Sequence, residues 1–120
     1  MSYDIHLNDP VTKQTIELEN PHFMRGGTYA IDVTKELSLN ITYNYACIFC
    51  RPGVLGKKGI RSIYGKTGAE SIPVLRKATE TLTDEVAPNY LKTTEGNVKK
   101  SLYQLLSMAH MRPDGVWYGD

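Results

Sequence analysis

The segment at residues 36–45, ELSLNITYNY, constrains the fold of this chain more than any other part of the sequence. Five apolar or aromatic residues in it alternate with polar ones: Leu37, Leu39, Ile41, Tyr43 and Tyr45. Since successive side chains of a strand point to opposite faces, this period of two predicts a strand with one buried face. The other face carries four uncharged polar residues: Ser38, Asn40, Thr42 and Asn44. It is either an ordinary sheet face that lacks charges or a surface that contacts a ligand or a second subunit.

Alternation also predicts strands at residues 3–8, 14–20 and 28–33. The turn sequence DPVTK separates the first two of these strands, so they are expected to form a hairpin. The second half of the chain changes to helical spacing, with an apolar stripe along residues 71–82 and a stronger one along residues 94–111.

The helix ends can be placed from their capping residues. Ser71 is a suitable N-cap for the first long helix, which puts Pro73 in its first turn, and Thr94 is suitable for the second. A further short helix is expected to end near Arg51. Strands followed by helices indicate an α+β fold, here an antiparallel sheet of about four strands in the N-terminal half with two or three helices packed on one face. We expect residues 1–120 to form a single domain.

Charge and hydropathy exclude several classes of function. Fourteen basic residues against thirteen acidic ones give a formal net charge of +1. A general nucleic-acid binder needs a large basic surplus, so nucleic acid is not an expected partner. No segment has the ~20 apolar residues of a membrane span, and the N-terminus does not resemble a signal peptide. We therefore expect a cytoplasmic protein that does not bind membranes.

The loop GKKGIRSIYGKTGAES contains Gly65-Lys66-Thr67, the three letters that close a nucleotide-binding P-loop. A P-loop needs a glycine five residues before Gly65, and the nearest one, Gly59, is one residue too far away. The loop is therefore not a P-loop.

Two interpretations of this loop remain. Backbone N–H groups in a glycine-rich turn before a helix can bind an anion, with Lys66 and Arg61 neutralising phosphates and Thr67 donating a hydrogen bond. Alternatively, Thr67 and Glu70 form a capping box, which needs no ligand.

Cys47 and Cys50 form a CxxC motif. Redox motifs of this kind follow a strand at a helix N-terminus, but here the intervening residues, Ile48 and Phe49, are unusually apolar. Without a second cysteine pair or clustered histidines, the four ligands of a zinc site are lacking. We expect buried, inert thiols and neither a metal nor a cofactor, with a thiol oxidoreductase as the alternative.

The C-terminal segment MRPDGVW joins a turn sequence to Arg112, Asp114 and Trp117. Terminal segments usually fray, whereas one with these aromatic and charged residues is expected to dock, either on its own domain or on a partner. Arg112 and Asp114 are candidate ligand contacts. Asp114 beside Arg112 would have a lowered pKa and make a poor general acid.

Three motifs, GIRSIYGKTGAESIP, TEGN and MRPDGVW, together resemble a family of small proteins encoded by tailed phages and prophages of Gram-positive bacteria. The resemblance covers most of the chain from ITYNY onward. It implies an accessory phage protein in a bacterial cytoplasm. By analogy, it implies a binder that counters a host defence system.

We therefore expect a binding protein without catalytic residues, whose partner is a nucleotide-like small molecule or a host defence protein. Lys66, Arg61 and Arg112 would contact phosphates. Other candidate contacts lie on the strand, its aromatic end and the C-terminal segment: Asn40, Tyr43, Asn44, Tyr45, Asp114 and Trp117. The uncharged sheet face also suggests a homodimer. The alternative is a small enzyme that uses the cysteine pair or processes nucleotides.

Overall fold

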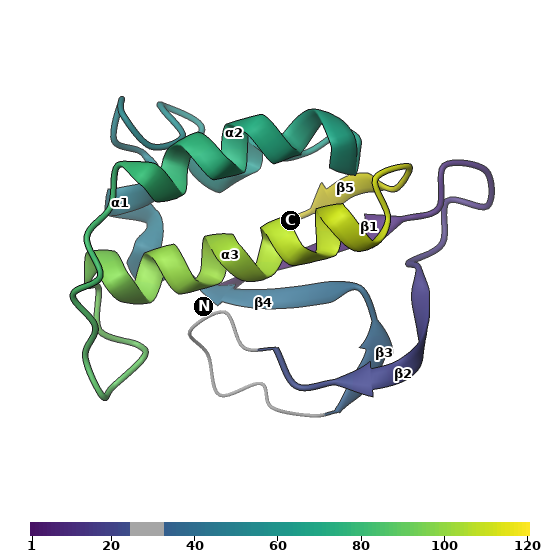
Figure 1. The fold of residues 1–120 in the computed structure, drawn as a ribbon, viewed down its shortest axis with the longest axis horizontal. Helices are drawn as coiled ribbons and strands as arrows, with labels where there is room; N and C mark the ends of the chain where they lie inside the picture. The colour runs from purple at the N-terminus through teal and green to yellow at the C-terminus, as the bar shows by residue number, and fades with distance from the viewer. Residues whose placement is uncertain (25–32) are drawn as a thin grey trace.

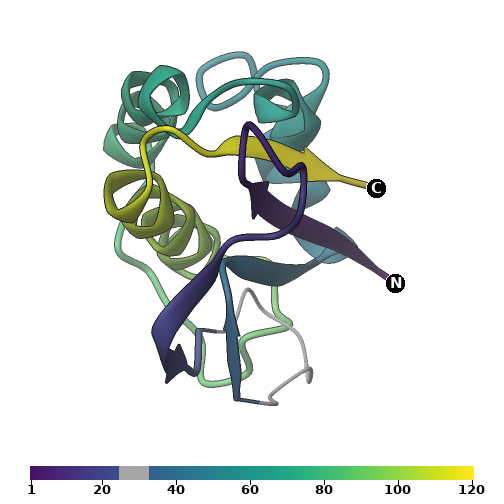
Figure 2. The ribbon, with the colours of Figure 1, turned by 90° about the vertical axis from the view of Figure 1, so that its right-hand side faces the viewer.

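The computed structural model describes residues 1–24 and 33–120, so the strand predicted at 28–33 lies almost wholly outside the described residues. The described chain folds into two layers (Figure 1). One layer holds the long helices α2 (Gly68–Glu80) and α3 (Glu95–Met111), which lie side by side and run in opposite directions. Figure 2 shows both helices on the same face of the main sheet. The predicted α+β class, with helices covering one face of an antiparallel sheet, is confirmed.

The main sheet has β1 (Ser2–Asn8) at its centre, between β4 (Ser38–Thr42) and β5 (Val116–Gly119), and both pairings are antiparallel. Ile5 of β1 lies opposite Leu39 of β4, and both side chains are buried. The sequence offers no periodic signal for β5, because this strand has only four residues. The main sheet is therefore completed from the C-terminal end of the chain.

The hairpin predicted between the first two strands forms only next to its turn, and the strands themselves pair elsewhere. β2 (Glu17–His22) pairs with β3 (Thr34–Glu36) in a separate two-stranded sheet. The predicted turn does form, since the N–H of Asp9 donates to the carbonyl oxygen of Gln14 at 2.8 Å. Next to the turn an antiparallel bridge joins Asn8 to Thr15, and the N–H of Ile16 donates to the carbonyl oxygen of Leu7 at 3.0 Å. The pairing does not extend into β2, because β4 and β5 occupy both edges of β1.

β4 ends at Thr42, earlier than the alternation predicts. The Thr42 hydroxyl accepts a hydrogen bond from the N–H of Asn44 at 3.2 Å and caps a short 3-10 helix at Tyr43–Tyr45. The helix α1 (Ala46–Phe49) follows at once, which confirms the short helix expected near Arg51. Threonine side chains compete in this way with strand hydrogen bonds, and apolar alternation does not reveal it.

α2 begins after Thr67 and not after Ser71, the predicted cap. The Thr67 hydroxyl accepts from the N–H of Glu70 at 3.1 Å, and the Glu70 carboxylate accepts from the N–H of Thr67 at 2.9 Å. Pro73 therefore lies inside the helix, where it cannot donate a backbone hydrogen bond. α3 begins as predicted, after Thr94.

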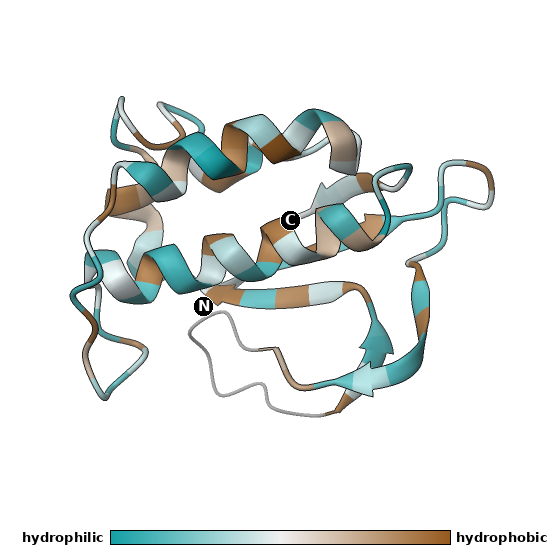
Figure 3. Ribbon diagram, viewed as in Figure 1, coloured by the Kyte–Doolittle hydropathy of each residue, from teal (hydrophilic) through white to brown (hydrophobic). Residues whose placement is uncertain are grey.

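The core lies between the helix layer and the main sheet. In Figure 3 the apolar positions recur along β4, α2 and α3 at the spacing of each element. The largest fully buried side chains come from every part of the described chain: Trp117, Tyr45, Phe49, Ile5, Leu7, Leu37, Ile41, Ile60, Ile63, Leu75, Leu102 and Leu105. The apolar stripes predicted for the two long helices are thus their buried faces.

Candidate functional site

The glycine-rich loop before α2 has its backbone donors occupied. Each N–H group from residue 65 to residue 70 donates to an acceptor of the same chain. The acceptors are the carbonyl oxygens of Trp117, Ile63, Gly115 and Pro113 and the side chains of Glu70 and Thr67. Hydrogen bonds thus attach the loop to β5 and to the turn before it. The capping-box interpretation of Thr67 and Glu70 is confirmed. A backbone cradle for phosphate is not available there.

The two basic residues predicted to contact phosphates at this loop differ, since Arg61 contacts its own chain and Lys66 acts through its charge. Hydrogen bonds from Thr67, with a smaller contribution from the charge of Lys66, lower the pKa of Glu70. Arg61 lies in a 3-10 helix, and its Nε–H donates to the carbonyl oxygen of Asp120 at 2.9 Å. Its guanidinium lies 4.9 Å from the ring centroid of Tyr3 and 5.9 Å from that of Tyr43. The fold thus brings together Arg61 and Tyr43, two predicted site residues.

The C-terminal segment docks on its own domain, which is the first of the two alternatives that the sequence left open. Arg112 donates two hydrogen bonds to the carboxylate of Asp114, at 2.9 and 2.8 Å, and these lower the pKa of Asp114. Arg112 also lies 3.7 Å from the carboxylate of Asp9. Trp117 is fully buried, and its Nε1–H donates to Oγ of Ser71 at 2.8 Å. A buried indole cannot stack on a ligand, and Arg112 already has two carboxylate partners.

The polar face of β4 lies beside charged residues of the neighbouring strand β1. Asn40 lies opposite Asp4 of β1, and its amide donates to the Asp4 carboxylate at 3.3 Å. His6 follows on the same face of β1. Asn44 lies beyond the strand, and its amide donates to the carbonyl oxygen of Leu91 at 3.0 Å. Asn40 and Asn44 therefore belong to different surfaces.

The prediction of buried thiols is wrong, since Cys47 and Cys50 are both exposed and free. α1 is a single turn, and its buried side is filled by Ile48 and Phe49. The cysteines that flank these two residues therefore point outward. The apolar residues between the cysteines are the anchor of this turn in the core.

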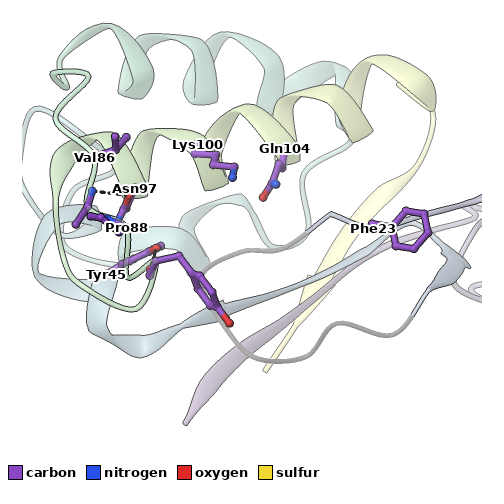
Figure 4. A pocket seen from close by; sticks show the side chains of 9 residues that line it. Phe23, Tyr45, Val86, Pro88, Asn97, Lys100 and Gln104 are labelled. Atoms are coloured by element: carbon purple, nitrogen blue, oxygen red, sulfur yellow. Dashed lines mark hydrogen bonds between the residues drawn. The ribbon is translucent and has the colours of Figure 1, made fainter.

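A pocket of about 590 Å³ lies beside the N-terminal half of α3. Its lining comes from the segments around β2 and α1, from the connection between α2 and α3, and from α3 itself. These residues are Phe23, Tyr45, Val86, Ala87, Pro88, Tyr90, Asn97, Lys100 and Gln104. Figure 4 shows Lys100 and Gln104 projecting from α3, with Phe23 on the β2 side of the pocket. This volume lies within the range of small-molecule sites. Among the sequence-predicted site residues, only Tyr45 lines the pocket.

One wall of the pocket is the connection between the two long helices, and the TEGN motif holds it in place. The side chain of Asn97 accepts from the N–H of Ala87 at 3.3 Å and donates to the carbonyl oxygens of Asn89 and Lys92, at 3.3 and 2.9 Å. The N–H of Gly96 donates to the carbonyl oxygen of Glu85 at 2.8 Å. The motif is therefore a structural device that shapes the pocket.

The polar groups of the pocket lie on α3. Oε1 of Gln104 is buried and has no hydrogen-bond partner among the described residues. Lys100 is exposed, and no described carboxylate pairs with it. Burial raises the pKa of Tyr45 to about 12, and its hydroxyl donates to the carbonyl oxygen of Tyr90. Within residues 1–24 and 33–120, the pocket thus offers aromatic walls, an unpaired cation and an unused acceptor.

Comparison with known proteins gave no match: no family model, no curated protein and no solved structure is similar to the chain. Within residues 1–24 and 33–120, no group of three or more His, Cys, Asp or Glu side chains could hold a metal ion. No described helix is long and apolar enough to cross a membrane. A functional proposal therefore depends on the chemistry of the pocket itself.

Sequence reasoning missed most of the residues that line this pocket. Lys100 and Gln104 stand four positions apart on a helix beside its apolar stripe, a spacing that places them on one face. This polar pair is the one sequence feature that could have indicated a site on α3. Phe23 and Val86 carried no signal, because only the tertiary structure brings β2 and the interhelical connection to the same side of α3.

Proposed function

We propose that the protein binds a nucleotide-derived small molecule in the pocket beside α3 and does not transform it. The observation that carries this proposal is the combination of aromatic walls with the acceptor of Gln104 and the ammonium of Lys100, both without a partner among the described residues. A binding role is supported further by the lining. Its described residues include no carboxylate, imidazole or thiol that could act as an acid, base or nucleophile.

Each pocket group suits one part of a nucleotide. Phe23, which is exposed, and Tyr90, which is half-buried, provide faces against which a base can stack. Gln104 Oε1 would accept a hydrogen bond from an exocyclic amino group, which would satisfy an acceptor that costs free energy while it is buried and unpaired. Lys100 would form a charge-assisted hydrogen bond with a phosphate oxygen.

The test is a thermal-shift and calorimetric titration with adenosine monophosphate. A ligand that binds only the folded state stabilises it by about 2.7 kcal/mol at a hundred times its Kd. We expect the shift to be lost in Lys100→Ala and kept in Lys66→Ala, which removes a lysine from the glycine-rich loop. The reverse pattern would move the site to that loop. Absence of binding by wild type would reject the proposal and favour a protein partner.

In a cell, such a binder would sequester its ligand, which agrees with the phage accessory role implied by the sequence motifs. We propose a cytoplasmic protein of this kind that counters a host defence signal. The homodimer remains a prediction, which sedimentation of the purified protein would test. A sedimenting monomer would remove it.

The exposed cysteine pair favours a second candidate function, that of a thiol oxidoreductase. Cys47 and Cys50 stand three positions apart around one helical turn, a separation that a disulfide can span. Cys47→Ser with Cys50→Ser would abolish any reductase activity toward a small disulfide substrate. Equal rates for this variant, wild type and a protein-free blank would exclude it.

A further inference from the structure

A second hollow of about 410 Å³ adjoins the pocket on the outward face of α3. Its lining comes from α3 and the start of the interhelical connection: Asp84, Val86, Gly96, Lys99, Lys100, Tyr103, Gln104 and Ser107. Val86, Lys100 and Gln104 line both hollows. The two hollows are therefore neighbouring compartments of one surface, with these three side chains at their boundary.

The two adjacent lysines of this surface differ in their electrostatic environment. Nζ of Lys99 lies 2.8 Å from the Asp84 carboxylate and 3.2 Å from the carbonyl oxygen of Leu82. The hydrogen bond with Asp84 raises the pKa of Lys99. Lys100 has no such partner among the described residues. The unpaired positive charge therefore lies at the boundary between the hollows, and the second hollow is close to neutral.

The second hollow has its own aromatic surface. Tyr103 is 49% exposed, so its ring is accessible to a ligand from solvent. It stands three positions after Lys100, so the two residues are neighbours on the helix surface. Val86, 65% exposed, adds apolar area between the compartments. Each compartment thus has an aromatic wall, with the free cation between them.

We propose that the ligand is a dinucleotide, with one base in each hollow and the linking phosphate at Lys100. This inference rests on the proposed function, because the first base and the phosphate would occupy the pocket described above. The second base would stack on Tyr103, whereas the mutual pairing of Lys99 and Asp84 leaves neither charge to attract a terminal phosphate into the second hollow. The surface therefore suits two nucleosides joined by one charged linker.

The experiment compares adenosine monophosphate with ApA, in which a single phosphodiester joins two adenosines. ApA carries less negative charge, so tighter binding of ApA must come from its second nucleoside. Stacking of one more base predicts a Kd about tenfold lower for ApA in wild type. Tyr103→Ala should raise the Kd of ApA to that of the monophosphate and leave the monophosphate unaffected. Tyr118→Ala, at an exposed tyrosine of β5, is the matched control and should change neither.

The outcomes separate this inference from the proposed function. Equal affinities for the two ligands in wild type, or equal effects of Tyr103→Ala and Tyr118→Ala, would overturn the dinucleotide assignment alone. The single-nucleotide pocket would stand if Lys100→Ala still abolished binding of the monophosphate. If wild type bound neither ligand, both proposals would fail. Melting temperatures of the variants, measured without ligand, would confirm that each protein is folded.

Discussion

Replacing Gly96 with alanine tests whether the TEGN motif shapes the pocket wall. A Cβ atom at this position would lie 2.5 Å from the carbonyl carbon of Glu85 and 2.7 Å from Cγ1 of Val86. Carbon atoms do not approach this closely, so the connection must move away from α3. Because the N–H of Gly96 donates to the Glu85 carbonyl oxygen at 2.8 Å, this movement also breaks or lengthens that hydrogen bond.

Two effects of opposite sign decide the magnitude. Alanine favours a helix over glycine by at most about 1 kcal/mol, and by less in the first turn. The lost hydrogen bond costs about 1 kcal/mol, and displacing packed atoms typically costs a further 1–3 kcal/mol. We expect a net loss of about 1–4 kcal/mol in the free energy of unfolding. Ligand affinity should fall as well, because Val86 lines both hollows.

Gly53→Ala is the matched control, since nothing lies within 4 Å of a Cβ atom at that position. Urea unfolding followed by fluorescence suits both variants, because the single tryptophan, Trp117, is fully buried. Gly53→Ala should leave the unfolding midpoint unchanged or raise it slightly. The reasoning fails if Gly96→Ala is as stable as Gly53→Ala.

Three further predictions concern an ion pair, a buried hydrogen bond and the exposed thiols. Asp114 has a lowered pKa when folded, so its ion pair with Arg112 stabilises the protein above about pH 4 and is lost as the pH falls through the folded pKa. The stability difference between wild type and Asp114→Asn should therefore shrink in acid, as urea titrations at several pH values would reveal; a constant difference would contradict this. Trp117→Phe removes the buried hydrogen bond to Ser71 and part of a core side chain, and should cost about 1–3 kcal/mol by circular dichroism melting; an unchanged melt would refute it. Both cysteine thiols should react with iodoacetamide in the native protein, and a mass showing no adduct before denaturation would contradict their exposure.

Much of the fold could be predicted from local patterns in the sequence. The alternation from Leu37 to Ile41 and the stripes of the two long helices depend only on which side of each element is buried. The cap at Thr94 was equally predictable, because a side chain and a backbone N–H three residues later form it locally. These features led to the correct fold class.

The candidate site was much less predictable. Lys66 and Arg112 are typical phosphate contacts by residue type, yet the structure engages the Lys66 loop in backbone pairing and Arg112 in ion pairs. Residue type indicates what a side chain can bind, whereas its partners in the fold decide whether it is free to do so. No sequence motif marks Lys100, and only the fold shows that it lies beside a pocket with no ion-pair partner in the described part of the chain.

The sequence by itself determined the elements, their buried faces and most of their ends, because hydrogen bonds and packing between near neighbours set these. The tertiary structure alone decided which strands pair, and it placed β5 beside β1 through contacts more than a hundred residues apart, such as Leu7 opposite Trp117. It likewise formed the pocket by bringing Phe23, Val86 and Lys100 together. Periodicity records that a residue is buried but carries no information about its distant partner, so long-range pairing and the site it creates appear only in the folded chain.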